Sequence, residues 1–193
     1  MKILCYGDSN TYGYDPRSFL SDRYPDENCW TTHLEQAGHH VLNYGMNGRE
    51  IPYRPPTIES AVRAFSAEQA DLLLIMLGSN DLLMQVSYHA EQVADRMDAF
   101  LQAIRRDLPE QPTLLLSPVP LGSGTWVQEE RLLRESARLA PLYAALAQKH
   151  SVDFVDTAQW DVPLTFDGVH FSTQGHLRFS AGLLAWLNSQ KYT

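Results

Sequence analysis

Residues 3–13 read Ile-Leu-Cys-Tyr-Gly-Asp-Ser-Asn-Thr-Tyr-Gly, and the expected fold follows from this stretch. A short apolar run, typical of a buried strand, breaks off into Gly-Asp-Ser. In open α/β sheets ligands bind outside the carboxyl ends of the strands, so this turn places the Ser9 hydroxyl at a binding edge. Gly7 permits the sharp bend and a close approach of a substrate to the backbone. Alone the tripeptide is a weak signal, because serine in a glycine turn is more often a cap or a turn former.

Further strands that end in polar or glycine-bearing loops are predicted at residues 40–44, 71–77, 113–116 and 152–156. The run 71–77 is almost continuously apolar, as a strand buried on both faces requires. Amphipathic helical patterns separate these strands along the chain. The alternation predicts an α/β fold with a five-stranded parallel sheet covered on both faces, in the flavodoxin-like order 2-1-3-4-5. A single domain over residues 1–193 is expected.

Helix boundaries are expected from capping residues and prolines. The prolines before Thr57 should keep the chain irregular until Thr57 caps a short helix. Pro141 should kink or divide the helix in which it lies. Ser172 should cap the last helix. The polar, turn-rich residues 14–28 predict a long surface loop, and loops of this length are often functional.

The composition of the 193-residue chain argues against several classes of partner and cofactor. A formal net charge of −8 argues against nucleic acid, because phosphate binding needs a basic surface. The sequence contains no run of about 18 apolar residues that would span a membrane. The few apolar residues before Gly7 are too short for a signal peptide, so a cytoplasmic location is expected. The two cysteines, Cys5 and Cys29, form no cysteine–histidine cluster, so no metal, cofactor or disulfide is expected.

Partners for Ser9 in catalysis are expected at the other strand ends. Serine is a poor nucleophile until a base takes its proton. Of the seven histidines, only His170 lies in a strand-end loop shortly after a carboxylate, so it is the candidate base. Asp167 is placed to accept the other ring N–H, fix the tautomer and stabilise the imidazolium. The alternative for Asp167 is an Asp-Gly turn former.

Donors for a developing negative charge are expected beside these residues. Attack on an ester carbonyl places charge on its oxygen, which needs hydrogen-bond donors already in position. The candidates are the backbone N–H groups of Ser9 and Gly48 and the side-chain amide of Asn80. Simple turn geometry for Gly48 and an Asx-turn for Asn80 are the alternatives. Asp8 and Asp81 are expected to bond nearby backbone and hold the loops, without a chemical role.

Four polar blocks follow one another over nearly the whole chain: Gly7-Asp8-Ser9, Gly48, Gly78-Ser79-Asn80-Asp81 and Asp167-Gly168-Val169-His170. In this order they resemble the signature blocks of the SGNH (GDSL) hydrolase family. The resemblance implies Ser9 as nucleophile, with Asp167 and His170 completing the triad. It implies an oxyanion hole made by Ser9, Gly48 and Asn80. It also implies a three-layer α/β/α fold and no metal.

Within this family, Gly-Asp-Ser-x-Thr-x-Gly and the leucine-rich run into Gly-Ser-Asn-Asp look most like small intracellular arylesterases and acetyl esterases. Two positions depart from the common pattern. Asn10 stands where leucine is usual, and Gly45 stands where serine or alanine is frequent. Neither is expected to touch the catalytic residues, but both are expected beside the pocket and so weaken any inference about the substrate.

The leading interpretation is a serine esterase acting on small carboxylic esters with acetyl, another short acyl, or aryl groups. The bulky residues Tyr12 and Met46 are expected beside the reacting groups, which favours short chains. A thioesterase or lysophospholipase with a longer acyl groove is the enzymatic alternative, and a catalytically silent binding protein of the same fold is the non-enzymatic one. A sugar-ester deacetylase also stays open, because Trp126, Tyr12, Tyr14 and Tyr88 could stack on a sugar ring. The partner expected is a small ester, and a homo-oligomer is left open.

Overall fold

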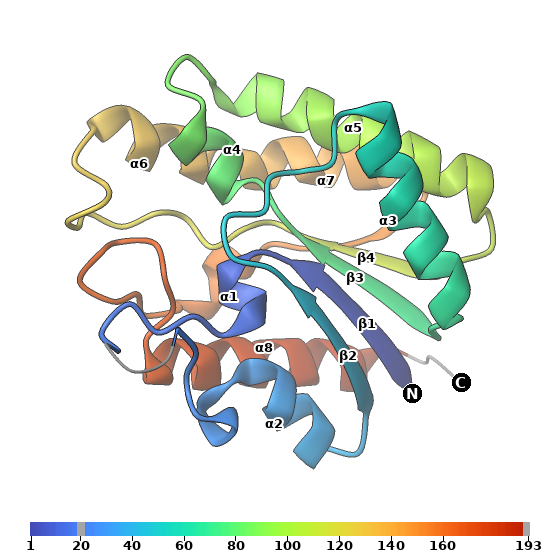
Figure 1. Ribbon diagram of the computed structural model, residues 1–193, viewed down its shortest axis with the longest axis horizontal. Coiled ribbons are helices and arrows are strands. Elements are labelled where there is room, and N and C mark those ends of the chain that lie inside the picture. The colour runs from blue at the N-terminus through green and yellow to red at the C-terminus, as the bar shows by residue number, and fades with distance from the viewer. Residues whose placement is uncertain (19–21, 191–193) are drawn as a thin grey trace.

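The centre of the molecule is a sheet of five parallel strands in the order β2-β1-β3-β4-β5. The computed structural model describes residues 1–18 and 22–190. The strands are β1 (Lys2–Gly7), β2 (His40–Gly45), β3 (Leu72–Met76), β4 (Thr113–Leu116) and β5 (Asp153–Val155) (Figure 1). The predicted strand order is therefore confirmed.

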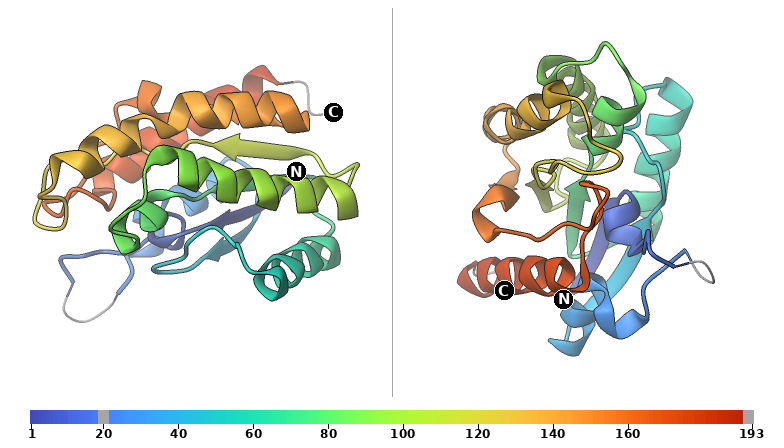
Figure 2. Two further views of the ribbon diagram at one scale, coloured as in Figure 1. Left: turned by 90° about the horizontal axis from the view of Figure 1, so that it is seen from above. Right: turned by 90° about the vertical axis from the view of Figure 1, so that its left-hand side faces the viewer.

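Helices cover both faces of this sheet (Figures 1 and 2). One layer contains α3 (Pro55–Glu68), α5 (Ala90–Asp107) and α7 (Leu139–His150), and the other contains α2 (Trp30–Gln36) and α8 (Thr173–Ser189). Successive side chains of a strand point to opposite faces. Accordingly, Leu4 and Tyr6 belong to the core under the first layer, whereas Ile3 and Cys5 belong to the core under the second. The predicted three-layer α/β/α fold is confirmed.

The carboxyl ends of β1, β2 and β3 lie side by side. Gly7 pairs with Gly45 on one side and with Met76 on the other. Because the strands are parallel, the loops that follow them start from the same edge of the sheet. These loops carry Ser9, Gly48 and Asn80.

Two short helices follow strands where the sequence predicted only turns. α1 (Ser9–Tyr12) begins directly after β1, and α4 (Ser79–Met84) follows β3. Their lengths of four and six residues are too short for an apolar period to be visible in the sequence. These helices set the directions of the side chains of residues 9–12 after β1 and of residues 79–84 after β3.

Helix α3 begins earlier than expected. Pro55 is its first residue, and Arg54 is the N-cap. Proline has no N–H, but the first turn of a helix leaves its N–H groups without intrahelical partners, so proline is tolerated there. Thr57 lies inside this first turn, where its hydroxyl accepts a hydrogen bond from the Arg54 N–H at 3.2 Å. The prediction of an irregular segment up to Thr57 is wrong for Pro55 and Pro56.

The helix expected to be divided near Pro141 consists of α6 (Glu130–Ala137) and α7. The break falls at Arg138, so Pro141 lies in the first turn of α7. Ser172 caps α8 as predicted, because its hydroxyl accepts a hydrogen bond from the N–H of Gly175 at 3.0 Å.

The remaining connections contain two short 3-10 helices, η1 (Asp26–Asn28) and η2 (Thr157–Trp160). In the predicted loop 14–28, Tyr14 and Arg23 form an isolated bridge. Residues 19–21 of that loop lie outside the described residues. Among residues 1–18 and 22–190, no helix has the length and apolar character of a membrane span.

Candidate active site

Ser9 is the first residue of α1, directly behind the end of β1. The Asp8 carboxylate caps this helix by accepting a hydrogen bond from the N–H of Asn10 at 2.9 Å. The bend at Gly7 is tight, because a Cβ there would lie 2.0 Å from the hydroxyl oxygen of Thr11. Ser9 is buried, and its N–H has no hydrogen-bond partner among the described residues. A free N–H is normal for the first turn of a helix, and it leaves a donor beside the serine hydroxyl.

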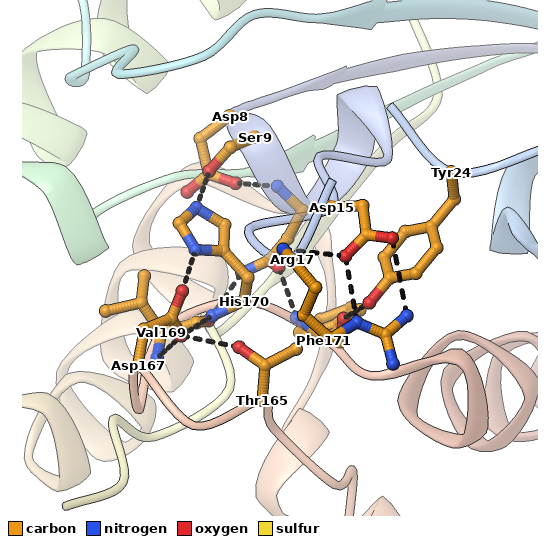
Figure 3. Close-up of polar contacts among 11 residues, drawn as sticks. Asp8, Ser9, Asp15, Arg17, Tyr24, Thr165, Asp167, Val169, His170 and Phe171 are labelled. Atoms are coloured by element: carbon orange, nitrogen blue, oxygen red, sulfur yellow. Dashed lines mark hydrogen bonds and ion pairs between the residues drawn. The ribbon is translucent and has the colours of Figure 1, made fainter. Parts of the chain in front are cut away.

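His170 joins Ser9 to Asp167 (Figure 3). Its Nε2 lies 2.9 Å from the Oγ of Ser9, and its Nδ1 lies 2.6 Å from the Oδ2 of Asp167. Ser9 follows β1, whereas the other two residues come from the loop before α8. His170 is only 3% exposed, so bulk water does not surround its imidazole. In this geometry the ring can take the hydroxyl proton while the carboxylate holds the other ring N–H.

Asp167 is held as a carboxylate. Its Oδ1 accepts hydrogen bonds from the N–H groups of Val169 (2.9 Å) and His170 (3.0 Å) and from the Thr165 hydroxyl (2.7 Å). Burial raises the pKa of this carboxyl, but the hydrogen bonds from these three residues outweigh burial and lower the pKa to about 2. The carboxylate is therefore ionised at neutral pH and can stabilise a protonated imidazole.

The loop between β4 and α6 closes over Asp167. The N–H of Gly122 donates to the carbonyl of Gly168 at 2.9 Å, and the N–H of Trp126 donates to the carbonyl of Asp167 at 3.1 Å. These backbone bonds hold the indole of Trp126 next to the imidazole.

Asn10 ties the segment of Ser9 to the segment of His170. Its Nδ2 donates to the carbonyl of Val169 at 3.0 Å, and its Oδ1 accepts from the N–H of Phe171 at 2.9 Å. The residue after the serine thus holds both peptide groups that flank the histidine. The sequence placed Asn10 only beside the pocket, because these partners lie 159 and 161 residues away along the chain.

Gly45, the other departure from the family pattern, packs against α1. A Cβ at this position would lie 2.1 Å from the backbone nitrogen of Tyr12. Serine or alanine therefore has no room here, and the glycine is required by packing.

Three candidate oxyanion donors belong to residues that line one cavity of about 400 Å³. The N–H groups of Ser9 and Gly48 have no hydrogen-bond partner among residues 1–18 and 22–190. The Nδ2 of Asn80 donates one hydrogen to the carbonyl of Arg49 at 3.1 Å, far along the chain and unlike an Asx-turn. An amide nitrogen carries two hydrogens, so a second donor remains. The structure thus brings these donors together with His170, which lines the same cavity.

Two aromatic rings flank His170 in this cavity. The ring centroid of Tyr14 lies 4.6 Å from that of His170, and the centroid of Trp126 lies 5.2 Å from it. Trp126 is 54% exposed, which is high for so large an apolar surface. Leu83 and Met84 add an apolar wall. Neither residue was predicted from the sequence, although both follow Asn80 at helical spacing in α4.

Two residues expected to contact substrate lie elsewhere. Tyr12 does not line the cavity that contains Ser9, and its hydroxyl donates to Asp22 at 3.1 Å. Met46 lines a neighbouring cavity of about 440 Å³, which shares only Gly48 with the first. Tyr12 is the last residue of α1, and the helical backbone directs its side chain away from Ser9. Met46 lies in the turn after β2, on the side that faces the neighbouring cavity.

Asp8 and Asp81 hold the loops, as predicted. The carboxylate of Asp81 accepts hydrogen bonds from the N–H of Ile51 at 3.0 Å and from Arg96 at 2.7 Å. Burial raises the pKa of each aspartate to about 6, although the hydrogen bonds oppose it. Arg96 also donates to the hydroxyl of Tyr88 at 2.8 Å, so this tyrosine belongs to the network and not to the wall of the cavity that contains the serine.

The model of the GDSL-like lipase/acylhydrolase family matches residues 5–178, a span that contains every residue of the site described above. The chain belongs to this family. As a GDSL-like hydrolase with esterase structural neighbours, it is a carboxylic ester hydrolase. No curated protein matches the sequence.

Several solved structures similar to this GDSL-like hydrolase are named as esterases. A putative arylesterase from Agrobacterium tumefaciens str. C58 has a TM-score of 0.82 at 28% identity, covering 97% of this chain and 98% of that chain. The native aryl esterase of M. Smegmatis has a TM-score of 0.83 at 25% identity, with coverage of 97% and 98%. A carbohydrate acetylesterase family member from Sinorhizobium meliloti has a TM-score of 0.82 at 28% identity, with coverage of 97% of each chain. The likeness extends over nearly the whole chain.

The two cysteines of this GDSL-like hydrolase are not among the residues that line the cavity of Ser9. Cys5 is buried in the core at β1, and Cys29 is buried at the start of α2. Within the described part of the chain, no group of three or more His, Cys, Asp or Glu side chains is placed to hold a metal ion.

Proposed function

We propose that this GDSL-like hydrolase is a serine esterase in which Ser9, His170 and Asp167 form the catalytic triad. The observation that carries the proposal is the unbroken series of contacts, 2.6 Å and 2.9 Å long, from the carboxylate through the imidazole to the hydroxyl. The hydroxyl belongs to a residue that lines a cavity of about 400 Å³, which is large enough for a small ester.

In the acylation step, Ser9 Oγ attacks the ester carbonyl carbon while His170 Nε2 takes the hydroxyl proton. The negative charge that forms on the carbonyl oxygen is stabilised by the N–H groups of Ser9 and Gly48 and by the amide of Asn80. The protonated imidazole is stabilised by Asp167. It then gives its proton to the leaving alcohol oxygen as the carbon–oxygen bond breaks.

In the deacylation step, water attacks the acyl-serine carbonyl while His170 takes one of its protons. The same three donors stabilise the second oxyanion. When the acyl–oxygen bond to Ser9 breaks, the imidazole returns the proton to the serine oxygen. The products are a carboxylic acid and the regenerated hydroxyl.

The position of His170 orients the substrate. Because its Nε2 protonates the leaving oxygen, the alcohol portion lies on the histidine side of Ser9. The rings of Tyr14 and Trp126 stand there, and flat faces of this kind stack on aryl groups or sugar rings. The names of the similar solved structures, arylesterase and carbohydrate acetylesterase, agree with such alcohols. We therefore favour short-acyl esters of aryl or other ring-bearing alcohols.

Short acyl groups are expected to be preferred. With the alcohol stacked at Trp126, the acyl group lies against Leu83 and Met84. Met84 is 61% exposed, so a long chain would extend past it into water and gain no further burial. In a series of nitrophenyl esters, acetate and butyrate should have a higher kcat/KM than esters of about ten or more carbons, measured below micelle concentrations. A higher kcat/KM for long chains would instead support a thioesterase or lysophospholipase.

The proposal is tested by a serine-reactive organophosphate. One equivalent should attach to the protein, and peptide mapping should place it on Ser9. Heat-unfolded protein, in which His170 no longer activates the hydroxyl, serves as the control and should not react. Labelling of a different serine in the folded protein would overturn the assignment.

A further inference from the structure

Arg49 contacts residues at the ends of β1 and β2 and in α4, the helix that follows β3. Its Nη1 donates to the carbonyl oxygen of Gly7 at 2.9 Å and also to that of Tyr44. Its guanidinium carbon lies 4.2 Å from the ring centroid of Tyr6. Its own carbonyl oxygen accepts the hydrogen bond from Asn80 Nδ2 at 3.1 Å. One residue therefore contacts the ends of β1 and β2 and the first turn of α4.

The turn that carries Gly48 has little packing of its own. The turn is closed by a hydrogen bond from the N–H of Arg49 to the carbonyl of Met46 at 3.2 Å. Met46 is 52% exposed. Apart from Gly48 itself and its two chain neighbours, no described residue has an atom within 4 Å of the point where a Cβ of Gly48 would be. Gly48 also lines both cavities, one on each side of the turn. Hydrogen bonds, rather than side-chain packing, must therefore place its N–H.

Arg49 contacts Asn80 directly, and its other contacts lie in or next to the segments that carry Gly48 and Ser9. Its side chain attaches the turn of Gly48 to Gly7, just before the serine. Its carbonyl oxygen can only accept, so it holds the Nδ2 of Asn80, and not the Oδ1, on its side. That orientation leaves the second N–H of the amide for a substrate oxygen. An oxyanion hole is effective only when its donors are aligned before the charge develops.

We propose that Arg49 is a positioning residue of the oxyanion hole, acting on the Gly48 turn through its guanidinium and on the Asn80 amide through its carbonyl. This inference rests on the proposed roles of Gly48 and Asn80. The planar guanidinium spans two carbonyl oxygens from one nitrogen while stacking on Tyr6. The ammonium of lysine can donate to the same carbonyl oxygens but lacks the planar face that lies over Tyr6.

The first test is Arg49→Met, which keeps an apolar side chain over Tyr6 but removes the donors. We expect kcat for an acetyl ester to fall by about 10- to 100-fold with KM changed by less than about threefold, because the lost alignment matters mainly in the transition state. Arg49→Lys should retain an intermediate kcat. Arg54→Met is the matched control: it makes the same change further along this segment, where the arginine stacks on Tyr53, and kcat should be unchanged.

The second test is a double-variant cycle with Asn80→Ala. Arg49→Met keeps the backbone carbonyl that accepts from Asn80, so it can affect the amide only by displacing the turn that carries this carbonyl. If the guanidinium holds that turn in place, the loss of kcat in the double variant should be smaller than the product of the two single losses. Independent effects would give the full product, and that result would overturn the proposed action of Arg49 on the amide. If Arg49→Met does not fold, Arg49→Lys carries the same cycle.

The kinetics of the two single variants distinguish the proposed role of Asn80 from that of Arg49. If Asn80→Ala keeps the wild-type kcat, the Asn80 amide is not an oxyanion donor, and this part of the proposed function is wrong. Impaired Asn80→Ala together with wild-type kcat in Arg49→Met would overturn only the role of Arg49.

Discussion

Replacing Ser9 with alanine is expected to lower kcat/KM for an acetyl ester by about 10⁴-fold or more, because the covalent step disappears and only binding and the oxyanion donors remain. The fold should persist. The hydroxyl bonds to His170, and the backbone of α1 is held independently by the Asp8 cap. The free energy of unfolding should therefore change by no more than about 1 kcal/mol. Steady-state kinetics and thermal unfolding of the same preparation measure both quantities.

The control for this variant is Ser123→Ala, the same chemical change at an exposed serine in the loop after β4. It should keep wild-type turnover. If Ser9→Ala is folded and retains more than about a tenth of the wild-type kcat/KM, the hydroxyl is not the nucleophile.

Replacing Asn80 with alanine is expected to lower kcat by about 10²- to 10³-fold, equivalent to roughly 3–4 kcal/mol, with little change in KM. The reason is that its amide binds a charge present only in the transition state. Acylation of Ser9 by a reactive probe should slow as well, since that step passes through the same kind of oxyanion. Rapid-mixing measurements with a nitrophenyl ester separate this step from deacylation.

Asn80 also supports its loop, because its Nδ2 donates to the carbonyl of Arg49. Loss of this bond should cost about 1 kcal/mol of stability in Asn80→Ala. Gln85→Ala is the matched control, since the Gln85 amide at the end of α4 donates to Glu50 at 3.0 Å in the same loop but lies outside the cavity of Ser9. It should lose similar stability and keep its kcat. Equal losses of kcat in the two variants would reduce Asn80 to a structural residue.

Asn80→Asp sharpens this contrast. Aspartate has nearly the same size but replaces the donor by a charged oxygen, which repels both the Arg49 carbonyl and a developing oxyanion. We expect it to be at least as inactive as Asn80→Ala and less stable than wild type. An active, folded Asn80→Asp enzyme would rule out the oxyanion role and leave the N–H groups of Ser9 and Gly48 as the proposed donors.

The sheet, and the edge at which its loops meet, could be predicted from local signals in the sequence. Apolar runs such as 71–77 are local signals, and the strand order follows from short right-handed connections. Once the strands are parallel, their carboxyl ends share an edge. That is why Ser9, Gly48, Asn80 and His170 could be expected to converge although they lie far apart in the chain. Glycine at 7 and 45 marks the ends of two of those strands.

Several of the side chains that surround these groups are placed by short helices and long-range contacts that leave no local signal in the sequence. The short helices α1 and α4 leave no periodic signal, yet they turn Tyr12 away from the cavity and bring Leu83 and Met84 into its wall. The contacts of Asn10 with the peptides beside His170 join residues about 160 positions apart, and no local pattern encodes them. Side-chain direction depends on backbone geometry over a few residues and on partners from distant segments. Tyr14 and Trp126 were named from the sequence as possible ring-stacking residues, whereas Leu83, Met84 and the contacts of Asn10 were not predicted.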